Sequence, residues 1–466
     1  MVVLLLWLSA VTGFAKGPDK DLMVKFPGGK CIMYRLYLSD KSGSSYSLAR
    51  PGEFLSVKSL ERRRRQSLTL DSTDLPVSPA YIERIETTGL EVVSKSRWNN
   101  TVVVRGRTQK QFRTLNSLPF VRKTVKVFTS PDSINKSVRS RYRTDYNRWD
   151  TLSTSEYGAT EQQINMLNGH RLHNMGYHGR GLTIAVVDGG FMNADVIPAL
   201  KGIKLMGTHD FVVPASKDVF KEMDHGTKVL STMAANIPNM YVGTAPQASF
   251  WLLRCEDVNT ENLVEEDFWA AAVEFADSAG VDIINSSLGF HGFDDKSADH
   301  TYTEQDGEQT LISHTASMLA HKGIILVNSA GNEGMGTWKK INFPADAKDI
   351  ITVGAISPSG KNAAFSAVGP TADRRIKPDV MALGSPTTVI TGRGTISKDM
   401  GTSFAAPLIT GMVACLWQAF PNKTALEIIR AVIQSGDKWT TPDDVYGYGV
   451  PDFMKAYQHL RTRNSR

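Results

Sequence analysis

Three side chains that can carry out proton transfer and nucleophilic chemistry occur in the order Asp188, His225 and Ser403. A serine hydroxyl is a weak nucleophile until a neighbouring base takes its proton, and a histidine held by a carboxylate is a suitable base. Taken alone, each residue has an ordinary structural interpretation: Asp188 as a turn residue, His225 as a capping or core histidine, and Ser403 as a helix cap. Only their joint placement can favour the chemical interpretation.

The segments around these residues predict an α/β protein with a doubly wound parallel sheet. Residues 182–187 form a continuous apolar run, which is typical of a strand buried on both faces. Helical and strand-like segments then alternate, as expected for βαβ units. We expect strands at 182–187, 249–253, 281–286, 323–327 and 350–356, and helices at 224–236, 265–279, 309–321 and after Ser403. In such sheets the functional crevice lies beyond the carboxyl ends of the strands.

The chain order of Asp, His and Ser fits one of the known arrangements of this triad on a parallel sheet, and Ser403 lacks the G-x-S-x-G surroundings of an esterase. From about residue 155 to the end, the chain resembles the subtilases, the subtilisin-like serine endopeptidases. The stretches that carry the resemblance are 185–189 (AVVDG), 224–227 (DHGT), 286–289 (SSLG), 329–334 (SAGNEG), 365–370 (FSAVGP), 375–380 (RIKPDV), 401–407 (GTSFAAP) and 448–449 (YG).

The resemblance implies a role for each of four residues. Ser403 would be the nucleophile, His225 the general base and later the acid, and Asp188 the group that orients the imidazole. Asn332 would donate its side-chain amide to the oxyanion, together with the backbone N–H of Ser403.

The resemblance also implies a binding site for an extended peptide. Ser287, Leu288 and Gly289 would form an edge that pairs with the substrate main chain. Ala330 and Gly331 would line the pocket for the residue before the scissile bond.

Two positions depart from the family pattern. Gly189 stands where the family usually has Ser or Thr after the aspartate, so a hydroxyl that could support Asp188 is missing. Lys228 begins a stretch, Lys-Val-Leu-Ser, where the family commonly has His-Val-Ala-Gly. Neither change removes a member of the triad, and we expect them to tune rate or specificity.

The segment 16–130 predicts a small α+β domain, with strands at 31–38, 92–93, 101–104 and 121–128 and helices at 57–66, 81–88 and 109–117. It resembles the inhibitory propeptides that precede subtilases, which implies folding assistance and inhibition until cleavage. Residues 16–150 contain 27 Lys+Arg against 13 Asp+Glu, whereas the rest of the chain has a net charge of −8. This contrast favours docking of a basic segment on an acidic partner domain.

The remaining segments predict processing and export. Residues 1–15 contain a short apolar run and small residues, typical of a signal peptide, so we expect a protein that is secreted or lies at the cell-envelope exterior, periplasmic or extracellular. Residues 131–159 have the composition of a linker with a processing region at 139–143, and the peptidase domain should cover 160–466. We expect a monomer whose partners are protein or peptide substrates and its own propeptide. We expect no membrane span and no nucleic-acid partner, because 62–65 is a single basic cluster without interleaved aromatic residues.

The chemistry requires no cofactor or metal. Subtilases often bind structural calcium, and an acidic loop contains Asp294, Asp295, Asp299 and Asp306, but it lacks EF-hand spacing. Three widely spaced cysteines give no disulfide framework, although a Cys255–Cys415 pair is left open. The alternative function is a pseudoprotease, in which the fold serves only as a binding module.

Overall fold

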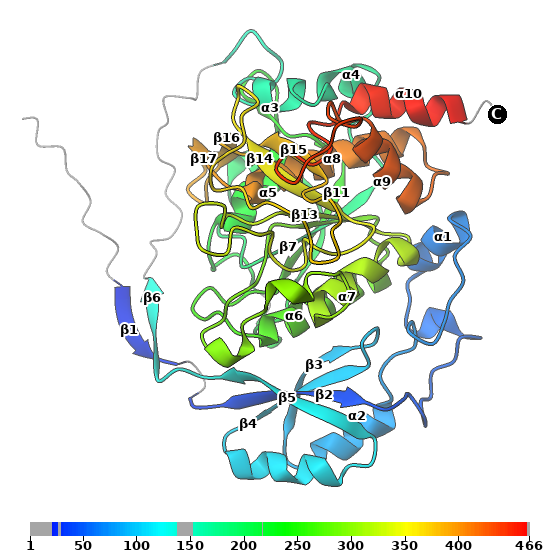
Figure 1. Ribbon diagram of the computed structural model, residues 1–466, viewed down its shortest axis with the longest axis vertical. Helices are drawn as coiled ribbons and strands as arrows, with labels where there is room; N and C mark the ends of the chain where they lie inside the picture. The colour runs from blue at the N-terminus through cyan, green and yellow to red at the C-terminus, as the bar shows by residue number, and fades with distance from the viewer. Residues whose placement is uncertain (1–20, 27–28, 138–151, 217, 464–466) are drawn as a thin grey trace, which may run out of the picture.

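A seven-stranded sheet forms the centre of the larger part of the molecule in a computed structural model, which describes residues 21–26, 29–137, 152–216 and 218–463 (Figure 1). All its strand pairs are parallel, in the order β15-β14-β13-β12-β7-β11-β8. This confirms the predicted parallel sheet. The strands are β7 (Thr183–Asp188), β8 (Lys204–Asp210), β11 (Ser249–Arg254), β12 (Ile283–Ser286), β13 (Ile325–Ser329), β14 (Ile351–Ile356) and β15 (Val380–Leu383).

Helices cover both faces of this sheet, and the alternation of side chains along β7 shows how. Ile184 and Val186 belong to a core with one group of helices, whereas Ala185 and Val187 belong to a core on the opposite face. The first group is α4 (Gly169–Asn174), α5 (His225–Ala234), α8 (Thr402–Ala419), α9 (Ala425–Gln434) and α10 (Phe453–Arg463); the opposite face carries α6 (Val264–Ala279) and α7 (Leu311–Met318).

Shorter elements complete the peptidase part. Two small hairpins and several single turns connect the main elements. They are α3 (Glu161–Asn165), η3 (Pro198–Leu200), β9 (Asn236–Ile237) paired with β10 (Tyr241–Val242), η4 (Lys296–Ala298), η5 (Tyr302–Glu304), η6 (Ala320–Lys322), and β16 (Thr387–Ile390) paired with β17 (Ile396–Asp399).

The N-terminal domain is an antiparallel sheet of four strands in the order β3-β4-β2-β5, backed by helices. One face of the sheet holds a separate core with Leu36, Val104, Ile85 and Phe112. The elements are β2 (Ile32–Leu38), η1 (Pro51–Glu53), α1 (Val57–Arg65), α2 (Pro79–Glu86), β3 (Glu91–Ser96), β4 (Thr101–Gly106), η2 (Gln109–Ser117) and β5 (Val121–Thr129). The helix expected at 109–117 is present with these bounds as the 3₁₀ helix η2, and Pro119 shortly after its end prevents continuation.

Two strands at the edges of this domain were not predicted. β1 (Asp21–Lys25) pairs antiparallel with β6 (Ser133–Ser137), so the first residues of the predicted linker form a strand. The predicted signal peptide and the predicted processing region at 139–143 lie outside the described residues.

The other face of the N-terminal sheet packs on α6, which lies directly above it in Figure 1. Met33, Val103 and Val127 join the same core as Phe268 and Trp269 of α6. Burial of apolar area on both sides supplies the non-directional part of this contact.

Basic side chains of the N-terminal domain meet acidic side chains of α6 in the same interface. Asp277, which is fully buried, forms ion pairs with Arg62, Arg63 and Arg97. Arg35 donates two hydrogen bonds of 2.7 Å to the carboxylate of Asp267. Further bonds join Glu274 to the backbone N–H of Arg97 at 2.7 Å and Lys126 to Asp295 at 2.9 Å. The predicted docking of a basic segment on an acidic domain is confirmed.

Helix α8 runs through the peptidase core and is longer than the apolar run after Pro407. It begins at Thr402 and contains Pro407 as its sixth residue. Pro407 has no N–H for the Ser403 backbone oxygen, which accepts a hydrogen bond from the Ser287 hydroxyl. By length and apolar composition alone this helix would suffice to cross a membrane, but 89% of that window is buried inside the protein, as in a core helix.

All three cysteines are free and buried. The Cys415 thiol donates to the backbone oxygen of Thr244 at 3.2 Å, so the pairing with Cys255 that the sequence left open is not formed.

Candidate active site

Asp188 and His225 lie in direct contact at the carboxyl edge of the parallel sheet. Asp188 is the last residue of β7, and His225 is the first residue of α5. His225 Nδ1 lies 3.0 Å and 2.9 Å from the two carboxylate oxygens of Asp188, which also accepts the N–H of Gly189 at 2.8 Å. Asp188 is fully buried, whereas 24% of the His225 side chain is exposed.

The environment makes His225 more basic than an ordinary histidine. Burial lowers the pKa of His225, but the charge and hydrogen bond of Asp188 outweigh burial and hold the pKa above its ordinary value. Glu256 raises this pKa further, and the positive charge of Lys228 lowers it. The pair is therefore arranged as a base with an orienting carboxylate.

Ser403 is the second residue of α8, where helix N–H groups lack partners within the helix. It is connected to Ser287, just after β12, by two reciprocal hydrogen bonds. Ser403 Oγ donates to the Ser287 backbone oxygen at 3.2 Å, and Ser287 Oγ donates to the Ser403 backbone oxygen at 2.8 Å. The ring of the next residue, Phe404, lies 5.5 Å from the His225 ring between centroids, which brings the histidine beside the start of α8.

Asn332 is held at the same helix terminus. Its Oδ1 accepts hydrogen bonds from the backbone N–H and the hydroxyl of Thr402, both at 3.0 Å. Thr402 Oγ1 also accepts the N–H of Gly331 at 3.2 Å, and Glu333 accepts the N–H of Asn332 at 2.7 Å. Because Oδ1 is engaged in this way, the amide nitrogen is the end of Asn332 that can act as a donor to a ligand.

The five predicted substrate-binding residues lie on two loops that follow neighbouring strands β12 and β13. The side chains of Ser287, Leu288 and Ala330 are buried, with 5%, 5% and 0% exposed, and Gly289 is half-buried. Gly331 has a φ of +111°, and a Cβ there would lie 2.8 Å from Glu333 Oε2, so glycine is required. Their binding role stays a prediction.

Glu256 is a neighbour of the Asp188–His225 pair that the sequence did not reveal. A Cβ at Gly189 would lie 2.7 Å from Glu256 Oε2 and 3.0 Å from Met223 Sδ. The space that a Ser or Thr would need beside Asp188 is therefore taken by Glu256. The signal in the sequence was the coincidence of a glycine at 189 with an acidic residue after the neighbouring strand β11.

The second departure from the family pattern, Lys228, connects two elements. Its ammonium group lies 3.3 Å from Asp224, one turn earlier, and 3.0 Å from Asp399 at the end of β17. Both contacts raise the pKa of Lys228 above its ordinary value although burial opposes them, so the group stays charged. It fastens the helix that carries His225 to the β16–β17 hairpin.

The four aspartates of the predicted acidic loop do not gather around one point. Asp295 pairs with Lys126, Asp299 accepts the N–H of Phe293 at 2.6 Å, and Asp306 accepts the N–H of Glu308 at 2.9 Å. In the described part of the chain, the acidic side chains that do gather are Glu256, Glu261 and Glu265. Burial and the neighbouring carboxylates raise the pKa of Glu256 to about 8 and that of Glu261 to about 7.

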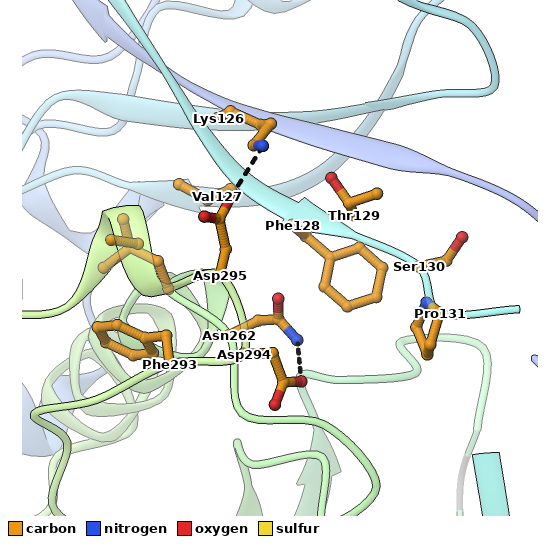
Figure 2. A pocket seen from close by; sticks show the side chains of 12 residues that line it. Lys126, Val127, Phe128, Thr129, Ser130, Pro131, Asn262, Phe293, Asp294 and Asp295 are labelled. Atoms are coloured by element: carbon orange, nitrogen blue, oxygen red, sulfur yellow. Dashed lines mark hydrogen bonds and ion pairs between the residues drawn. The ribbon is translucent and has the colours of Figure 1, made fainter. Parts of the chain in front are cut away.

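A cavity of about 300 Å³ lies between β5 and the loops around α6. Figure 2 shows Phe128 beside this cavity, together with the Lys126–Asp295 ion pair and the Asn262–Asp294 hydrogen bond. Both domains line it, so it belongs to the interface between them and exists only while the N-terminal domain is docked.

Comparison with known proteins agrees with this fold. Residues 179–449 match the subtilase family, Peptidase_S8, and residues 33–144 match the Peptidase S8 propeptide domain of Bacteroidota. The chain is 27% identical over 355 residues to subtilisin NAT of Bacillus subtilis subsp. natto, covering 76% of this chain and 84% of that protein. It is 26% identical over the same length to subtilisin E of Bacillus subtilis. The MycP3 protease from the type VII (ESX-3) secretion system shares the fold, with a TM-score of 0.53 and 21% identity over 66% of this chain and 90% of that one.

A doubly wound sheet that carries a histidine–carboxylate pair and a serine at a helix N-terminus fits a hydrolase of the serine type. The family match covers more than half of the chain, and the chain belongs to the subtilase family. It is a subtilisin-like serine endopeptidase with an N-terminal propeptide domain, which implies processing of a zymogen.

Proposed function

We propose that the chain hydrolyses peptide bonds through an acyl-enzyme on Ser403, with His225 and Asp188 as the other members of the triad. The observation that carries the proposal is the contact of His225 Nδ1 with both oxygens of buried Asp188, beside the helix that begins with Thr402-Ser403. A fixed Nδ1–H leaves Nε2 as the basic nitrogen, which is the tautomer that the reaction needs.

Catalysis begins when the Ser403 hydroxyl turns from the Ser287 backbone oxygen toward His225. Such a change between staggered rotamers is small, and catalytic hydrogen bonds are often incomplete before substrate binds. Ser403 Oγ then attacks the carbonyl carbon of the scissile bond while His225 takes the proton. His225 returns that proton to the leaving amine, and water attacks the acyl-enzyme by the same route in reverse.

The negative charge on the tetrahedral intermediate would be stabilised at the start of α8. The amide nitrogen of Asn332 and the backbone N–H of Ser403 are the donors, and Thr402 holds Asn332 in place through two hydrogen bonds of 3.0 Å. Loss of one such donor costs about 2.7–4 kcal/mol, a magnitude known from subtilisin itself. Extended substrates would pair with Ser287–Gly289 and place the residue before the scissile bond against Ala330 and Gly331.

The enzyme would be made as a secreted, self-processing zymogen whose propeptide inhibits it in cis. The buried ion pairs between the N-terminal domain and α6 support a domain that stays docked after cleavage of the linker. Export through a signal at 1–15, cleavage within 131–159 and a monomeric state belong to this proposal, and the reaction itself uses no metal.

The test of the nucleophile is labelling of the mature protein with a fluorophosphonate. We expect labelling of the wild type and of Ser359→Ala, which changes an exposed serine away from the site, and none of Ser403→Ala. If the folded, mature wild type is not labelled, the enzyme proposal is wrong and the pseudoprotease alternative takes its place.

Self-processing is tested by expressing Ser403→Ala and wild type in a host without extracellular proteases. The wild type should yield a species cut between residues 130 and 160, and Ser403→Ala should keep its full length. Cleavage of Ser403→Ala at the same bond would show that another protease performs this step.

A further inference from the structure

Asn342 lies between the two loops that we expect to bind the substrate. Its backbone N–H donates to the Ala330 backbone oxygen at 2.9 Å, which fixes it to the loop after β13. The next residue, Phe343, exchanges two backbone hydrogen bonds of 2.9 Å and 2.8 Å with Phe290, in the loop after β12. The segment 342–343 is thus bonded to both loops.

The side chain of Asn342 faces a glycine of each loop. A Cβ at Gly289 would lie 2.8 Å from Asn342 Cβ, and a Cβ at Gly331 would lie 3.0 Å from Asn342 Cγ. Both distances are shorter than an ordinary van der Waals contact, so both glycines make room for the same side chain. Because Gly289 and Gly331 are predicted to bind the substrate, Asn342 would form the base of the pocket between them.

The amide of Asn342 keeps an unsatisfied acceptor. The residue is 4% exposed, and its Oδ1 has no hydrogen-bond partner in the part of the chain that the structure describes. A buried acceptor without a donor is costly and calls for an explanation. The amide nitrogen lies 3.1 Å from the Cβ position of Gly331, and rotation about the broad last torsion of the side chain turns the oxygen to that side. A substrate donor between the loops would then satisfy it.

A carboxylate approaches the same point from the loop after β13. Glu333 Oε2 would lie 2.8 Å from a Cβ at Gly331, and it accepts the N–H of Asn332 at 2.7 Å, which holds it there. Glu333 is half-buried, so water screens its charge only in part. An amide oxygen and a negative charge beside one glycine suit a cationic donor.

We propose, on the basis of the function proposed above, that Asn342 and Glu333 select a basic residue, arginine or lysine, immediately before the scissile bond. The guanidinium or ammonium group would donate to the Asn342 oxygen and pair with the Glu333 carboxylate. Both groups carry donors and a positive charge and no acceptor, which matches the two acceptors. An acidic residue would meet the charge of Glu333, and an apolar residue would leave the Asn342 amide unsatisfied.

The linker of the chain itself is compatible with this selection. A self-processing enzyme must accept a bond of its own linker, and residues 136–148 contain five basic side chains against one acidic side chain. In the processing region expected at 139–143, with the sequence RSRYR, arginine alternates with other residues. Every second bond there would place an arginine before the scissile bond.

The selection is tested with the mature wild-type enzyme on quenched fluorescent peptides that differ only in the residue before the scissile bond, with mass spectrometry to identify the cleaved bond. The six peptides carry Arg, Lys, Gln, Leu, Phe or Glu there. We expect kcat/KM for Arg and Lys at least about tenfold above Leu and Phe, the range of hydrogen bonds to charged groups, and the lowest value for Glu.

The variants are compared by the ratio of kcat/KM for the Arg and Leu peptides, which is measured within one enzyme and does not depend on its overall activity. Asn342→Leu keeps the size of the side chain without the amide and should lower the ratio about tenfold or more. Glu333→Gln should also lower it, and Asn342→Asp, which adds a negative charge, should raise it. The matched control, Asn422→Leu at an exposed position after the end of α8, should keep the wild-type ratio.

Fluorophosphonate labelling separates this inference from the proposed function, because it reports the nucleophile whatever the substrate preference. A mature wild type that is not labelled would overturn the proposed function. A labelled wild type that prefers Leu, Phe, Gln or Glu peptides would overturn the selection of basic residues alone, as would a labelled Asn342→Leu with an unchanged ratio. If Asn342→Leu does not fold, the ratio must rise in Asn342→Asp and fall in Glu333→Gln, and any other pair of results rejects the inference.

Discussion

Asp277 and Glu265 are two buried carboxylates on helix α6. They differ in their partners: Asp277 has three arginines, and Glu265 keeps an oxygen without a donor. Asp277, near the end of α6, is surrounded by the guanidinium groups of Arg62, Arg63 and Arg97. Glu265, in the first turn, keeps one oxygen without a donor. Both side chains are at most 1% exposed, so burial alone does not distinguish them.

The two carboxyls also differ in the direction in which their surroundings shift the pKa. The three arginines come from the propeptide domain, and together they hold the pKa of Asp277 below its ordinary value although burial raises it. For Glu265, burial and the neighbouring glutamates raise the pKa well above the ordinary value. One end of α6 thus binds the propeptide domain through three arginines, whereas the buried carboxylate at the other end keeps an oxygen without a donor.

The largest expected effect on stability comes from Asp277→Asn, which removes the carboxylate that the three arginines share. Three buried arginines would lose a shared partner, and burial already lowers the pKa of Arg62 to about 10. Removing one member of a buried ion pair costs about 3–5 kcal/mol. We expect a loss of this size in the free energy that protects the β3–β4 amides, measured by hydrogen exchange on the Ser403→Ala chain.

The control for this prediction is the exposed pair Arg105–Glu91, whose side chains are 43% and 60% exposed. Glu91→Gln should cost less than about 1 kcal/mol, because exposed pairs are well solvated. Equal effects of Asp277→Asn and Glu91→Gln would contradict the assignment of Asp277 as the anchor of the propeptide domain.

A smaller effect on stability is expected from Gly189→Ser, which places a side chain against Glu256. The new Cβ would lie 2.7 Å from Glu256 Oε2, which is the end of a flexible side chain and can move, so the cost should lie near the lower limit of the about 1–3 kcal/mol that overpacking brings. Denaturant unfolding should show the loss in Gly189→Ser and its partial recovery in Gly189→Ser with Glu256→Ala. Gly202→Ser, where a Cβ meets no atom within 4 Å, should be neutral.

The coupling energy between the two substitutions decides the interpretation. Residues in contact are non-additive, whereas independent sites add within about 0.5 kcal/mol. If the double variant loses as much as the sum of the singles, Glu256 does not fill the space that a hydroxyl would occupy beside Asp188.

The sequence predicted the parts of the site that local pattern determines. The apolar run before Asp188 and the glycine after His225 marked a strand end and a helix start, and both lie where expected, at the end of β7 and the start of α5. The antiparallel edge strand β6 was missed because its pairing with β1, more than 100 residues away, leaves no local signal.

The contacts across the chain could not be predicted for the same reason. That Ser403 bonds Ser287, or that Glu256 occupies the space beside Gly189, depends on the register of neighbouring strands. The charge asymmetry indicated that the domains attract, but it did not show that Asp277 is the shared partner of three arginines. The roles of Asp188, His225, Ser403 and Asn332 remain predictions that geometry supports and labelling tests.

The smallest expected effect is on the pKa of His225, which the nearby carboxyl of Glu256 raises. The reaction needs neutral His225, and its pKa lies above 6.5, so kcat/KM should rise with pH and reach half its maximum above pH 6.5. Glu256, whose own pKa is about 8, is only partly ionised near this midpoint, so Glu256→Gln should move the midpoint slightly to lower pH. Because the positive charge of Lys228 lowers the pKa of His225, Lys228→Met should move the midpoint to higher pH. Each shift should be below one pH unit, less than about 1.4 kcal/mol. Profiles of kcat/KM on a neutral peptide, measured with a chelator present, report the midpoints. Midpoints that move in the same direction for both variants would show that the two charges do not act on His225 as the geometry requires.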